Sequence, residues 1–584
     1  MYLQINRKSS EGIYFSKKSS EFYFEYKDYR LIIDSPKTNN QLQEKSSSLI
    51  DFIKRVIDRT LTNDWMTSFI GGHYAIVLWN VNNLSTWLIR DIAGAKTIYY
   101  STNHDVITVG NALYDFKVPR SLNIEALRRK RKLCYLIDGD TFYHEISEVK
   151  MGNVVTFDEL NMPIISHNFG LKLLKYDSLD TTEECVKLLR QNIIDVHENM
   201  ASNSNIVLLS GGIDSSVMLA SLNEIKTAHM DLRAVTFKLK GTSEDETPYA
   251  RDVAERFGTK IESIEVDPNC KSMVEKFETE VVQMNSPYHG ALIYGNLSAG
   301  RDSCYFAGQD SRLHTPAINW IDNLFFDYVE KSQFQSLYSS AKNKSAFFTK
   351  ILDGLSRSNH RSIRGLARLG YFWDPQEYVR KYMLGAENKG SGIVEYEVIN
   401  NSKLFKVEVS SQRDLYNQIT EFRWGTQFTS DMHYLQDMAM FNETNMCLPF
   451  YDIRLARFSS GLPFKKATAF DKGTSQFDSM KVEKVNKFFL REAFKTDLPL
   501  HLASRQKAVS RTLYLIFNGP LGQYIRDIVH QDSQKAKDSI ALVLGYSKVA
   551  TWFLNRRRFD PQDERLLTDV FQLSCIIRRS NKHD

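Results

Sequence analysis

Alternation of apolar and polar residues dominates the first 165 positions of the chain. Short aromatic-rich runs such as EFYFEYKDYRLIID (21–34), GGHYAIVLWNV (71–81) and STWLIRDI (85–92) are separated by polar turns. Period-two patterning of this kind predicts antiparallel strands. The segment SSLIDFIKRVIDRTL (47–61) instead has apolar residues at helical spacing and predicts an amphipathic helix. The region is therefore expected to be an α+β layer structure.

The pattern changes after residue 180. DTTEECVKLLRQNIIDVHENM (180–200) begins with the capping pair Thr181 and Glu184 and predicts a helix. Apolar, β-branched runs then alternate with helical patterns: a strand at 205–209, a helix from 214, a strand at 232–239, and a loop, helix and strand over 241–266. This order predicts a parallel sheet covered by helices. The residues expected on the buried face of the first helix are Cys185, Leu188, Ile193 and Val196.

The turn after the strand at 205–209 carries candidate chemistry. Gly211 and Gly212 permit backbone angles closed to other residues, so consecutive N–H groups can line an anion site at a helix amino terminus. The hydroxyls of Ser210, Ser215 and Ser216 add donors, and Asp214 is an oxygen ligand suited to Mg²⁺. Pyrophosphate with magnesium fits this set; the alternative is a glycine-rich turn of an ordinary α/β domain.

Composition narrows the class of protein. The 584 residues suggest two or three domains, and 42% apolar with 25% charged residues is ordinary for a globular protein. Lys and Arg number 75 against 70 for Asp and Glu, which gives no general argument for nucleic acid. The six cysteines are scattered, which argues against a structural zinc or a disulfide framework. We expect reduced thiols, no membrane association and a cytoplasmic protein, because no apolar run approaches membrane-spanning length and no signal peptide is visible.

The motif S-G-G-x-D-S resembles the pyrophosphate loop of the N-type ATP pyrophosphatases. Residues 69–101 and 121–158 resemble the glutaminase-type domain of the asparagine synthetase family. The resemblance implies an α/β chain with an N-terminal Ntn-hydrolase-like α+β domain at 1–168. It also implies an adenine-nucleotide α-hydrolase-like parallel-sheet synthetase domain at 180–545. An insert at about 330–430 and a helical basic tail at 546–584 complete the expected organisation.

The resemblance also assigns roles to further residues. Leu208 and Leu239 would line the adenine pocket, with ordinary sheet core as the alternative. Gly308, Gln309 and Asp310 occupy the place of a second family loop, where Asp310 would be a second Mg²⁺ ligand or a solvated turn residue. The residue after the glycine is Glu in asparagine synthetases and Tyr in β-lactam synthetases, so Gln309 matches neither.

One further match concerns charge at the phosphates. The segment KFFLREAFKTDLPLHLASRQKAVSR (487–511) resembles the family segment that ends in R-x-K. By that match Lys507 would neutralise charge on the phosphates and on the tetrahedral intermediate.

The sequence departs from the family at the position of the glutaminase nucleophile. Active glutaminases of this class carry a cysteine directly after the initiator methionine, whereas here residue 2 is Tyr2 and the first cysteine is Cys134. We therefore predict a glutaminase-shaped scaffold that does not hydrolyse glutamine.

The resemblance implies an AMP-forming carbon–nitrogen ligase with ATP and Mg²⁺ as cofactors. Its substrate would be a small molecule or peptide that carries both carboxylate and amine, as in the β-lactam synthetases and the lasso-peptide macrolactam synthetases. A precursor peptide and a peptidase are the expected partners in the second case. The alternatives are an asparagine synthetase that uses free ammonia and a nucleotide-binding pseudoenzyme or interaction subunit.

Overall fold

The computed structural model describes the chain in separate sections. They are residues 2–6, 13–16, 21–35, 42–43, 45–103, 105–116, 121–133, 136, 139–171, 173, 179, 181–240, 245–267, 278, 281, 303–308, 417, 420–421, 424, 429–442, 444–463, 487–499, 502, 519, 522–524, 527 and 571–576. Gln309, Asp310 and Lys507 lie outside the described residues, as do Cys134 and residues 330–416 of the expected insert, with its helical and basic patterning.

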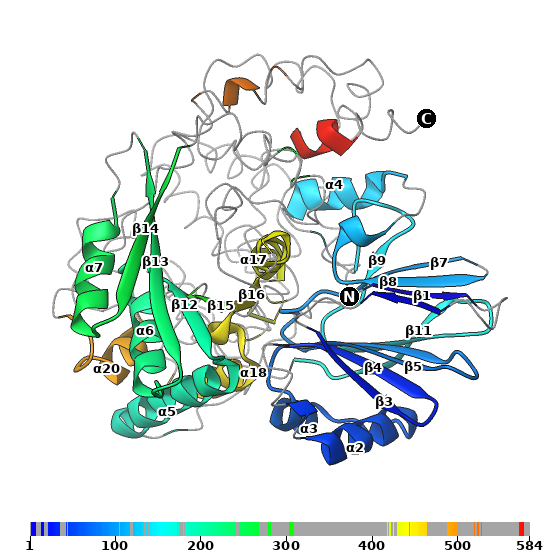
Figure 1. Cartoon of the computed structure of the whole chain (residues 1–584), viewed down its shortest axis with the longest axis horizontal. Coiled ribbons are helices and arrows are strands. Elements are labelled where there is room, and N and C mark those ends of the chain that lie inside the picture. Colours follow the sequence, from blue (N-terminus) through cyan, green and yellow to red (C-terminus); the bar gives the residue numbers. More distant parts are fainter. Residues whose placement is uncertain are drawn as a thin grey trace, which may run out of the picture.

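Two antiparallel sheets form the amino-terminal part (Figure 1). One has the order β2-β1-β8-β7-β9 and consists of β1 (Tyr2–Asn6), β2 (Ile13–Ser16), β7 (Tyr99–Thr102), β8 (Val106–Gly110) and β9 (Ser147–Glu148). The other has the order β11-β10-β6-β5-β4-β3 and consists of β3 (Phe22–Tyr26), β4 (Tyr29–Asp34), β5 (Ala75–Asn80), β6 (Thr86–Arg90), β10 (Asn153–Phe157) and β11 (Pro163–Asn168).

The alternation seen in the sequence explains how these layers pack. Ile32, Val77 and Leu88 of the six-stranded sheet share a core with Leu3 and Val109 of the five-stranded sheet. The opposite face of the six-stranded sheet is covered by α2 (Ser46–Ile57) and α3 (Asn63–Phe69), whose buried residues join a second core. The helices α4 (Ile124–Leu133) and η1 (Leu113–Asp115) complete this part. The predicted antiparallel strands and the amphipathic helix are confirmed.

The second part is built on a parallel sheet. Its order is β14-β13-β12-β15-β16, formed by β14 (Lys260–Val266), β13 (Asp231–Leu239), β12 (Ser204–Leu208), β15 (Ser303–Ala307) and β16 (Asn445–Cys447). Every neighbouring pair is parallel, as the alternation of strands and helices predicted. The central strand is β12, so the turn that follows it lies in the middle of the carboxyl edge of the sheet.

Helices cover this sheet on both faces. The helices α5 (Thr182–Met200), α6 (Ile213–Glu224), α7 (Thr247–Arg256), α18 (Ile453–Ser460) and α20 (Phe488–Ala493) pack on one face, in a core that includes Val207 and Phe306. Ile206 and Leu208 point to the other face and share a core with α17 (Thr429–Phe441). The short helix η6 (Pro449–Tyr451) links β16 to α18.

Helix α5 corrects one detail of the sequence analysis. Its cap is as expected, because the Thr181 hydroxyl accepts the Glu184 N–H at 3.2 Å. Leu188, however, is 37% exposed, while Leu189 is fully buried. A stripe that runs through residues 185, 189 and 193 follows steps of four residues, which leaves position 188 at its edge.

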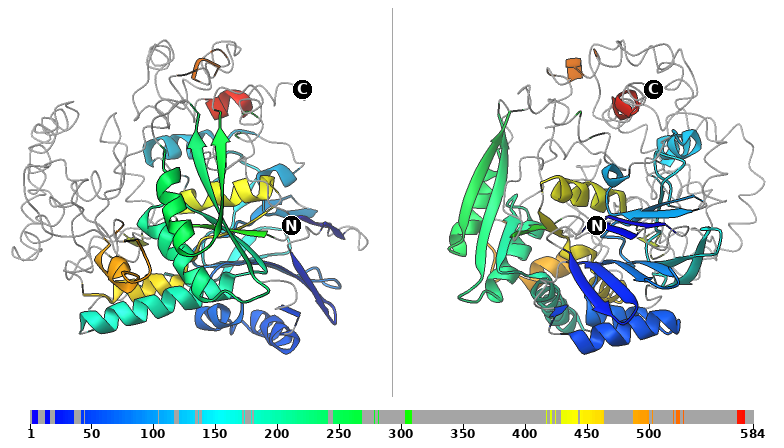
Figure 2. Two further views of the ribbon diagram at one scale, coloured as in Figure 1. Left: turned by 60° about the vertical axis from the view of Figure 1, so that its left-hand side comes forward. Right: turned by 45° about the vertical axis from the view of Figure 1, so that its right-hand side comes forward.

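The antiparallel layers and the parallel sheet lie on either side of α17 (Figures 1 and 2). His433 of α17 contacts Arg90 of β6 and Glu148 of β9, and Trp424 donates its indole N–H to the carbonyl of Ala93 at 2.8 Å. All of these side chains are buried. The two parts of the chain are therefore joined through a desolvated polar contact. Among the described helices there is none with the length and apolar character that crossing a bilayer requires.

Candidate functional site

The turn between β12 and α6 has the conformation that its glycines suggested. Gly211 has φ +67°, in the left-handed region that side chains avoid. A Cβ at this position would lie 2.6 Å from the Cβ of Tyr249 in α7. Gly212 caps α6, and the carboxyl edge of the sheet therefore meets the positive end of a helix dipole. The predicted sequence of strand, tight turn and helix is confirmed.

The three serines of the motif gather around this turn, but they do different things. Ser215 and Ser216 are buried, and their hydroxyls donate to the carbonyl of Gly212 at 3.2 and 2.8 Å. The Ser215 hydroxyl also accepts the Ser210 N–H at 3.2 Å. Ser210 is exposed, and its own hydroxyl accepts the Gly212 N–H at 3.3 Å. Ser215 and Ser216 therefore shape the loop, whereas Ser210 is presented at its surface.

The second predicted loop begins beside the first. Leu208 pairs with Ala307 in the register of β12 and β15, so Gly308 directly follows the neighbouring strand end. A Cβ on Gly308 would lie 3.0 Å from the backbone nitrogen of Ser215. Only glycine lets this backbone approach the first turn of α6 without displacement. The structure thus brings Gly308 to the first loop.

A cation that the sequence analysis did not single out lies at the same place. The Lys487 ammonium contacts both carboxylate oxygens of Asp214, at 2.5 Å from Oδ1. The side chain of Lys487 is 9% exposed and that of Asp214 is 19% exposed. The expected cation was Lys507. Lys487 was nevertheless visible in the sequence, because it is the first residue of the segment at 487–511 on which the Lys507 expectation rested.

The backbone of Lys487 is unusual. Its φ of 56° and ψ of 42° are left-handed, and it immediately precedes α20. Left-handed backbone at a residue other than glycine costs about 1–2 kcal/mol. A conformation of this cost is retained only where the surroundings hold it, and such residues concentrate at functional sites.

Of the two leucines expected at the adenine, only Leu208 has a described side chain. Leu208 is 8% exposed and belongs to the core that faces α17, together with Val235 and Ala307. Leu239 is the last residue of β13, and its side chain is outside the description. Leu208 therefore has core contacts and also lies at the strand end that leads into the loop.

Arg90 and Asp91 of the amino-terminal part hold the backbone that follows them. Arg90 donates to the carbonyls of Gly94 at 2.8 Å and Lys96 at 2.7 Å. Asp91 accepts the N–H groups of Ala95 and Lys96 at 3.0 and 3.1 Å. Burial raises the pKa of Asp91, although the nearby charges of His73 and Arg90 oppose the shift. This pair builds a rigid turn at the contact with α17.

Glu148 supplies the negative charge between Arg90 and His433 at the contact with α17. Burial alone would raise its pKa, but the charges and hydrogen bonds of Arg90 and His433 outweigh burial and lower the pKa to about 2. The Nε2 atom of His433 lies 2.9 Å from Oε1 of Glu148 and 2.8 Å from Nη2 of Arg90. The carboxylate is therefore ionised throughout the neutral range and fixes the two parts together.

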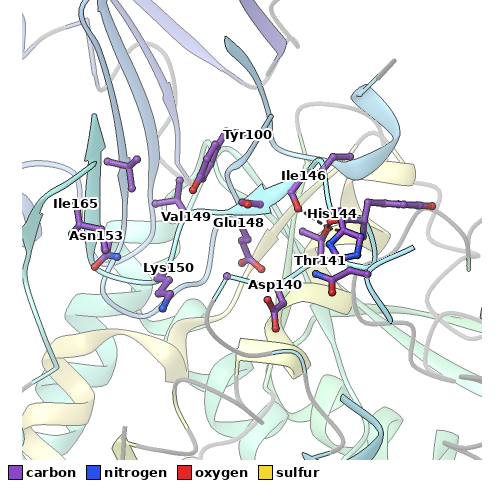
Figure 3. Close-up of a pocket in the computed structure, with 15 residues that line it drawn as sticks. Tyr100, Asp140, Thr141, His144, Ile146, Glu148, Val149, Lys150, Asn153 and Ile165 are labelled. Carbon is purple, nitrogen blue, oxygen red and sulfur yellow. Dashed lines mark hydrogen bonds between the residues drawn. The ribbon is translucent and has the colours of Figure 1, made fainter. Parts of the chain in front are cut away.

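A cavity of about 160 Å³ opens on the amino-terminal part (Figure 3). Its walls come from β7, β9, β10, β11 and the segment at 139–146, and its polar lining includes Asp140, His144 and Lys150. None of its lining residues belongs to the turn after β12. It is separate from the candidate site.

The described residues could hold magnesium only together with oxygen atoms of a bound phosphate group. No group of three His, Cys, Asp or Glu side chains that could hold a metal occurs among the described residues. Mg²⁺ is commonly held by one or two carboxylates together with phosphate oxygens of a substrate. Asp214 alone would meet that need at the turn, provided that Lys487 shifts from its carboxylate to the phosphates.

Comparison with known proteins relates this site to a family. Residues 196–282 and 306–566, more than half of the chain, match the family described as Asparagine synthase. The glutamine-hydrolysing Asparagine synthetase 1 of Bacillus subtilis is 23% identical over 494 residues, which cover 80% of this chain and 72% of that protein. The Gibberella zeae protein Amidase chry2 is 24% identical over 230 residues. This alignment covers 36% of the chain and 34% of the relative, so the chain spans about a third of the length of that protein.

Similarity to solved structures is weak. A glutamine phosphoribosylpyrophosphate amidotransferase from B. subtilis, complexed with ADP and GMP, matches with a TM-score of 0.17 at 12% identity. The match covers 52% of this chain and 59% of that chain. A similarity at this level carries no argument about fold or function.

Proposed function

Because the chain belongs to the asparagine synthase family, we propose that it is an ATP-dependent, AMP-forming amide-bond synthetase. One observation carries the proposal: the turn after β12 presents a helix amino terminus, and Lys487, 273 residues from Asp214, is held against it. A concave backbone with an adjacent buried cation is the arrangement that a phosphate chain requires.

The chemistry follows from this arrangement. The β- and γ-phosphates of ATP would rest on Ser210, Gly211 and Gly212, and a substrate carboxylate would attack the α-phosphorus. Pyrophosphate leaves, and an amine then attacks the acyl-adenylate to give an amide and AMP. Negative charge builds on the phosphorus and then on the carbonyl oxygen, and a positioned cation stabilises both.

Several residues take supporting roles in this proposal. Lys487 is the cation at the phosphates, and Lys507 remains the candidate for the tetrahedral intermediate. Asp214, with Asp310, would hold magnesium, which screens phosphate charge when bound. Leu208 and Leu239 would border the adenine, while Gly308 and Gln309 would border the reacting carboxylate.

The amino-terminal part is proposed to be a scaffold. We assign residues 1–168 to an Ntn-hydrolase-like domain without glutaminase activity and residues 180–545 to an adenine-nucleotide α-hydrolase-like synthetase domain. Tyr2 is the first residue of β1, pairs with Ser16 and Gly110, and carries a phenol in place of the family thiol. The engagement of Arg90 and Asp91 with the turn at 91–96 supports a structural role for this region.

The amine then comes from the substrate itself or from free ammonia. A substrate with both carboxylate and amine would give a macrolactam or β-lactam product, and a precursor peptide with a peptidase would be its natural partners. Similarity to the Bacillus asparagine synthetase supports a second candidate, an asparagine synthetase. With Tyr2 in place of the family cysteine, that enzyme would take free ammonia. A third candidate is a nucleotide-binding pseudoenzyme, favoured by the absence of the family residue at Gln309.

ATP–pyrophosphate exchange distinguishes these candidates. The purified full chain is incubated with radiolabelled pyrophosphate, ATP and magnesium, with aspartate or with peptides that contain acidic side chains and a free amine. Exchange with a peptide supports the proposal, and exchange with aspartate alone identifies the ammonia-dependent enzyme. ATP binding without exchange for any carboxylate would refute a synthetase. Glutamine hydrolysis is measured in parallel and is expected to be absent.

A further inference from the structure

Two buried cysteines from distant parts of the chain meet within the parallel sheet. Cys304 lies in β15 and Cys447 in β16, 143 residues later, and their Sγ atoms are 2.6 Å apart. Both residues are free thiols, and they are 3% and 0% exposed. They share the core on the face covered by α5 and α6. Nothing in the proposed reaction uses them.

This separation is closer than packing alone explains. Carbon atoms in contact prefer about 3.5–4.0 Å, and sulfur is the larger atom. A disulfide bond measures about 2.05 Å, so the two sulfur atoms need to approach by only roughly half an ångström. The geometry thus lies nearer to a bond than to a contact between independent thiols.

The register explains how the sulfur atoms approach. Cys304 pairs with Asn445, and Cys447 pairs with Phe306, so the two cysteines are diagonal neighbours on one face of the sheet. Both side chains must lean along the strands to meet. A bond between them would link two neighbouring strands, and thiol–disulfide exchange would return it to two thiols.

We propose that Cys304 and Cys447 form a reversible oxidation site that closes to a disulfide between β15 and β16. The oxidant belongs to the class of hydroperoxides. The sulfur of Cys304 attacks the peroxide oxygen, giving a sulfenic acid and, for hydrogen peroxide, water. The sulfur of Cys447 then displaces the hydroxyl, which leaves as a second water. Two thiols lose two electrons and two protons, and one peroxide is reduced.

The order of these steps follows from the surroundings. Burial, together with the neighbouring Cys304 thiol, raises the pKa of Cys447 well above the ordinary value for a thiol. Because the thiolate is the nucleophile, Cys447 reacts poorly with peroxide and Cys304 is oxidised first. Cys447 then meets the sulfenic acid at a sulfur 2.6 Å away, and its thiol proton leaves with the displaced hydroxyl as water.

The proposed disulfide would involve β15, the strand that leads into the proposed nucleotide site. Gly308 follows β15 directly and packs on the Ser215 backbone, and β16 leads through η6 to the helix α18. Oxidation would therefore link the edge strand β16 covalently to β15, whose end lies beside the proposed nucleotide loop. The disulfide itself does not depend on the proposed function.

The test uses the full chain under native conditions. The protein is treated with hydrogen peroxide and excess peroxide is removed with catalase. It is then unfolded in guanidinium chloride that contains N-ethylmaleimide, so that the buried thiols that remain are blocked, and peptides are analysed by mass spectrometry without reduction. We expect a peptide pair linked through Cys304 and Cys447 that dithiothreitol separates. We also expect the oxidised protein to melt roughly 3 °C or more above the reduced protein, because the link closes a long loop.

Two variants provide the controls. Cys304→Ser should lose both the linked peptide and the shift in Tm, whereas Cys575→Ser, a buried cysteine of the other core cluster, should retain both. Should Cys304→Ser fail to fold, the comparison of oxidised and reduced wild type carries the test alone. Complete N-ethylmaleimide labelling of both cysteines after peroxide treatment, a sulfinic acid without a link, or an unchanged Tm would each overturn the proposal.

Discussion

The ammonium of Lys487 lies 2.5 Å from Oδ1 of Asp214, although 273 residues separate them. This ion pair closes the carboxyl edge of the parallel sheet at the turn after β12. It also places a positive charge where the proposed phosphates would lie, held by a backbone in the left-handed region. The lysine therefore neutralises Asp214, and in the proposed reaction its ammonium would turn toward the phosphates of the nucleotide.

Lys487→Ala tests this role. We expect ATP–pyrophosphate exchange to fall by about 100- to 1,000-fold, the usual cost of removing one group that stabilises transition-state charge. Lys487→Arg should keep part of the activity because the charge remains. Lys495→Ala is the matched control, since the side chain of Lys495 is 64% exposed and its ammonium lies 2.9 Å from Glu492. Exchange within threefold of wild type in Lys487→Ala would remove the residue from the mechanism.

Lys507→Ala separates the two lysines. If both act on the reaction, each variant loses turnover while the far-ultraviolet circular dichroism stays the same. Unchanged turnover in Lys507→Ala alone would leave Lys487 as the cation of the site.

Asp214→Asn examines the other partner of the ion pair. Exchange should be abolished at all magnesium concentrations, because the carboxylate that would hold the metal with the phosphates is gone. Stability should also fall by about 1–3 kcal/mol, since the ammonium of Lys487 loses its partner at a largely buried position. Asp231→Asn, at the amino end of β13 and 55% exposed, serves as the control. Retained exchange in Asp214→Asn would contradict the metal role.

Gly211→Ala tests the loop conformation. Two effects add here: a left-handed backbone costs a side chain about 1–2 kcal/mol, and the new Cβ would lie 2.6 Å from Tyr249. We expect the Kd for ATP, measured by calorimetry, to rise at least tenfold, which corresponds to a loss of about 1.4 kcal/mol in binding free energy. Gly258→Ala is a close match, because φ is +58° but no atom lies within 4 Å of its Cβ. Equal behaviour of the two variants would show that the contact with Tyr249 is unimportant.

Burial of His197 should make the free energy of unfolding depend on pH. Burial lowers its pKa from 6.5 to about 4, and the hydrogen bond from Nδ1 to the Ile193 carbonyl at 2.7 Å offsets this shift only in part. The folded pKa is depressed, so the unfolded chain binds the proton first as pH falls. The related stability is complete above pH 6.5 and is lost progressively toward pH 4, by about 3 kcal/mol in total.

Urea unfolding at pH 7.5 and at pH 4.5 measures this effect. His197→Gln should reduce the difference between the two values, because an amide does not titrate. His229→Gln, which changes an exposed histidine, should leave the difference as in wild type. An equal pH dependence in His197→Gln and wild type would show that other groups cause it.

Local pattern was sufficient for the elements and for the loop. Alternation predicted the antiparallel strands, β-branched runs predicted β12 and β13, and the motif at 210–216 predicted the turn that Gly211 and Gly212 adopt. These features depend on residues close in sequence. Leu188 shows the limit even here, because a difference of one position decides whether a side chain at the edge of a helical stripe is buried.

The sequence by itself determined where a phosphate-binding turn would form and that residue 2 has no thiol, because both depend on the identity of neighbouring residues. Only the tertiary structure decided which distant side chains meet there. Lys487 reaches Asp214, and Cys304 reaches Cys447, because strands and helices far apart in the chain pack on one sheet. Sequence spacing contains no information about such contacts, since they depend on strand order and register, which the buried faces select only when the whole sheet has assembled.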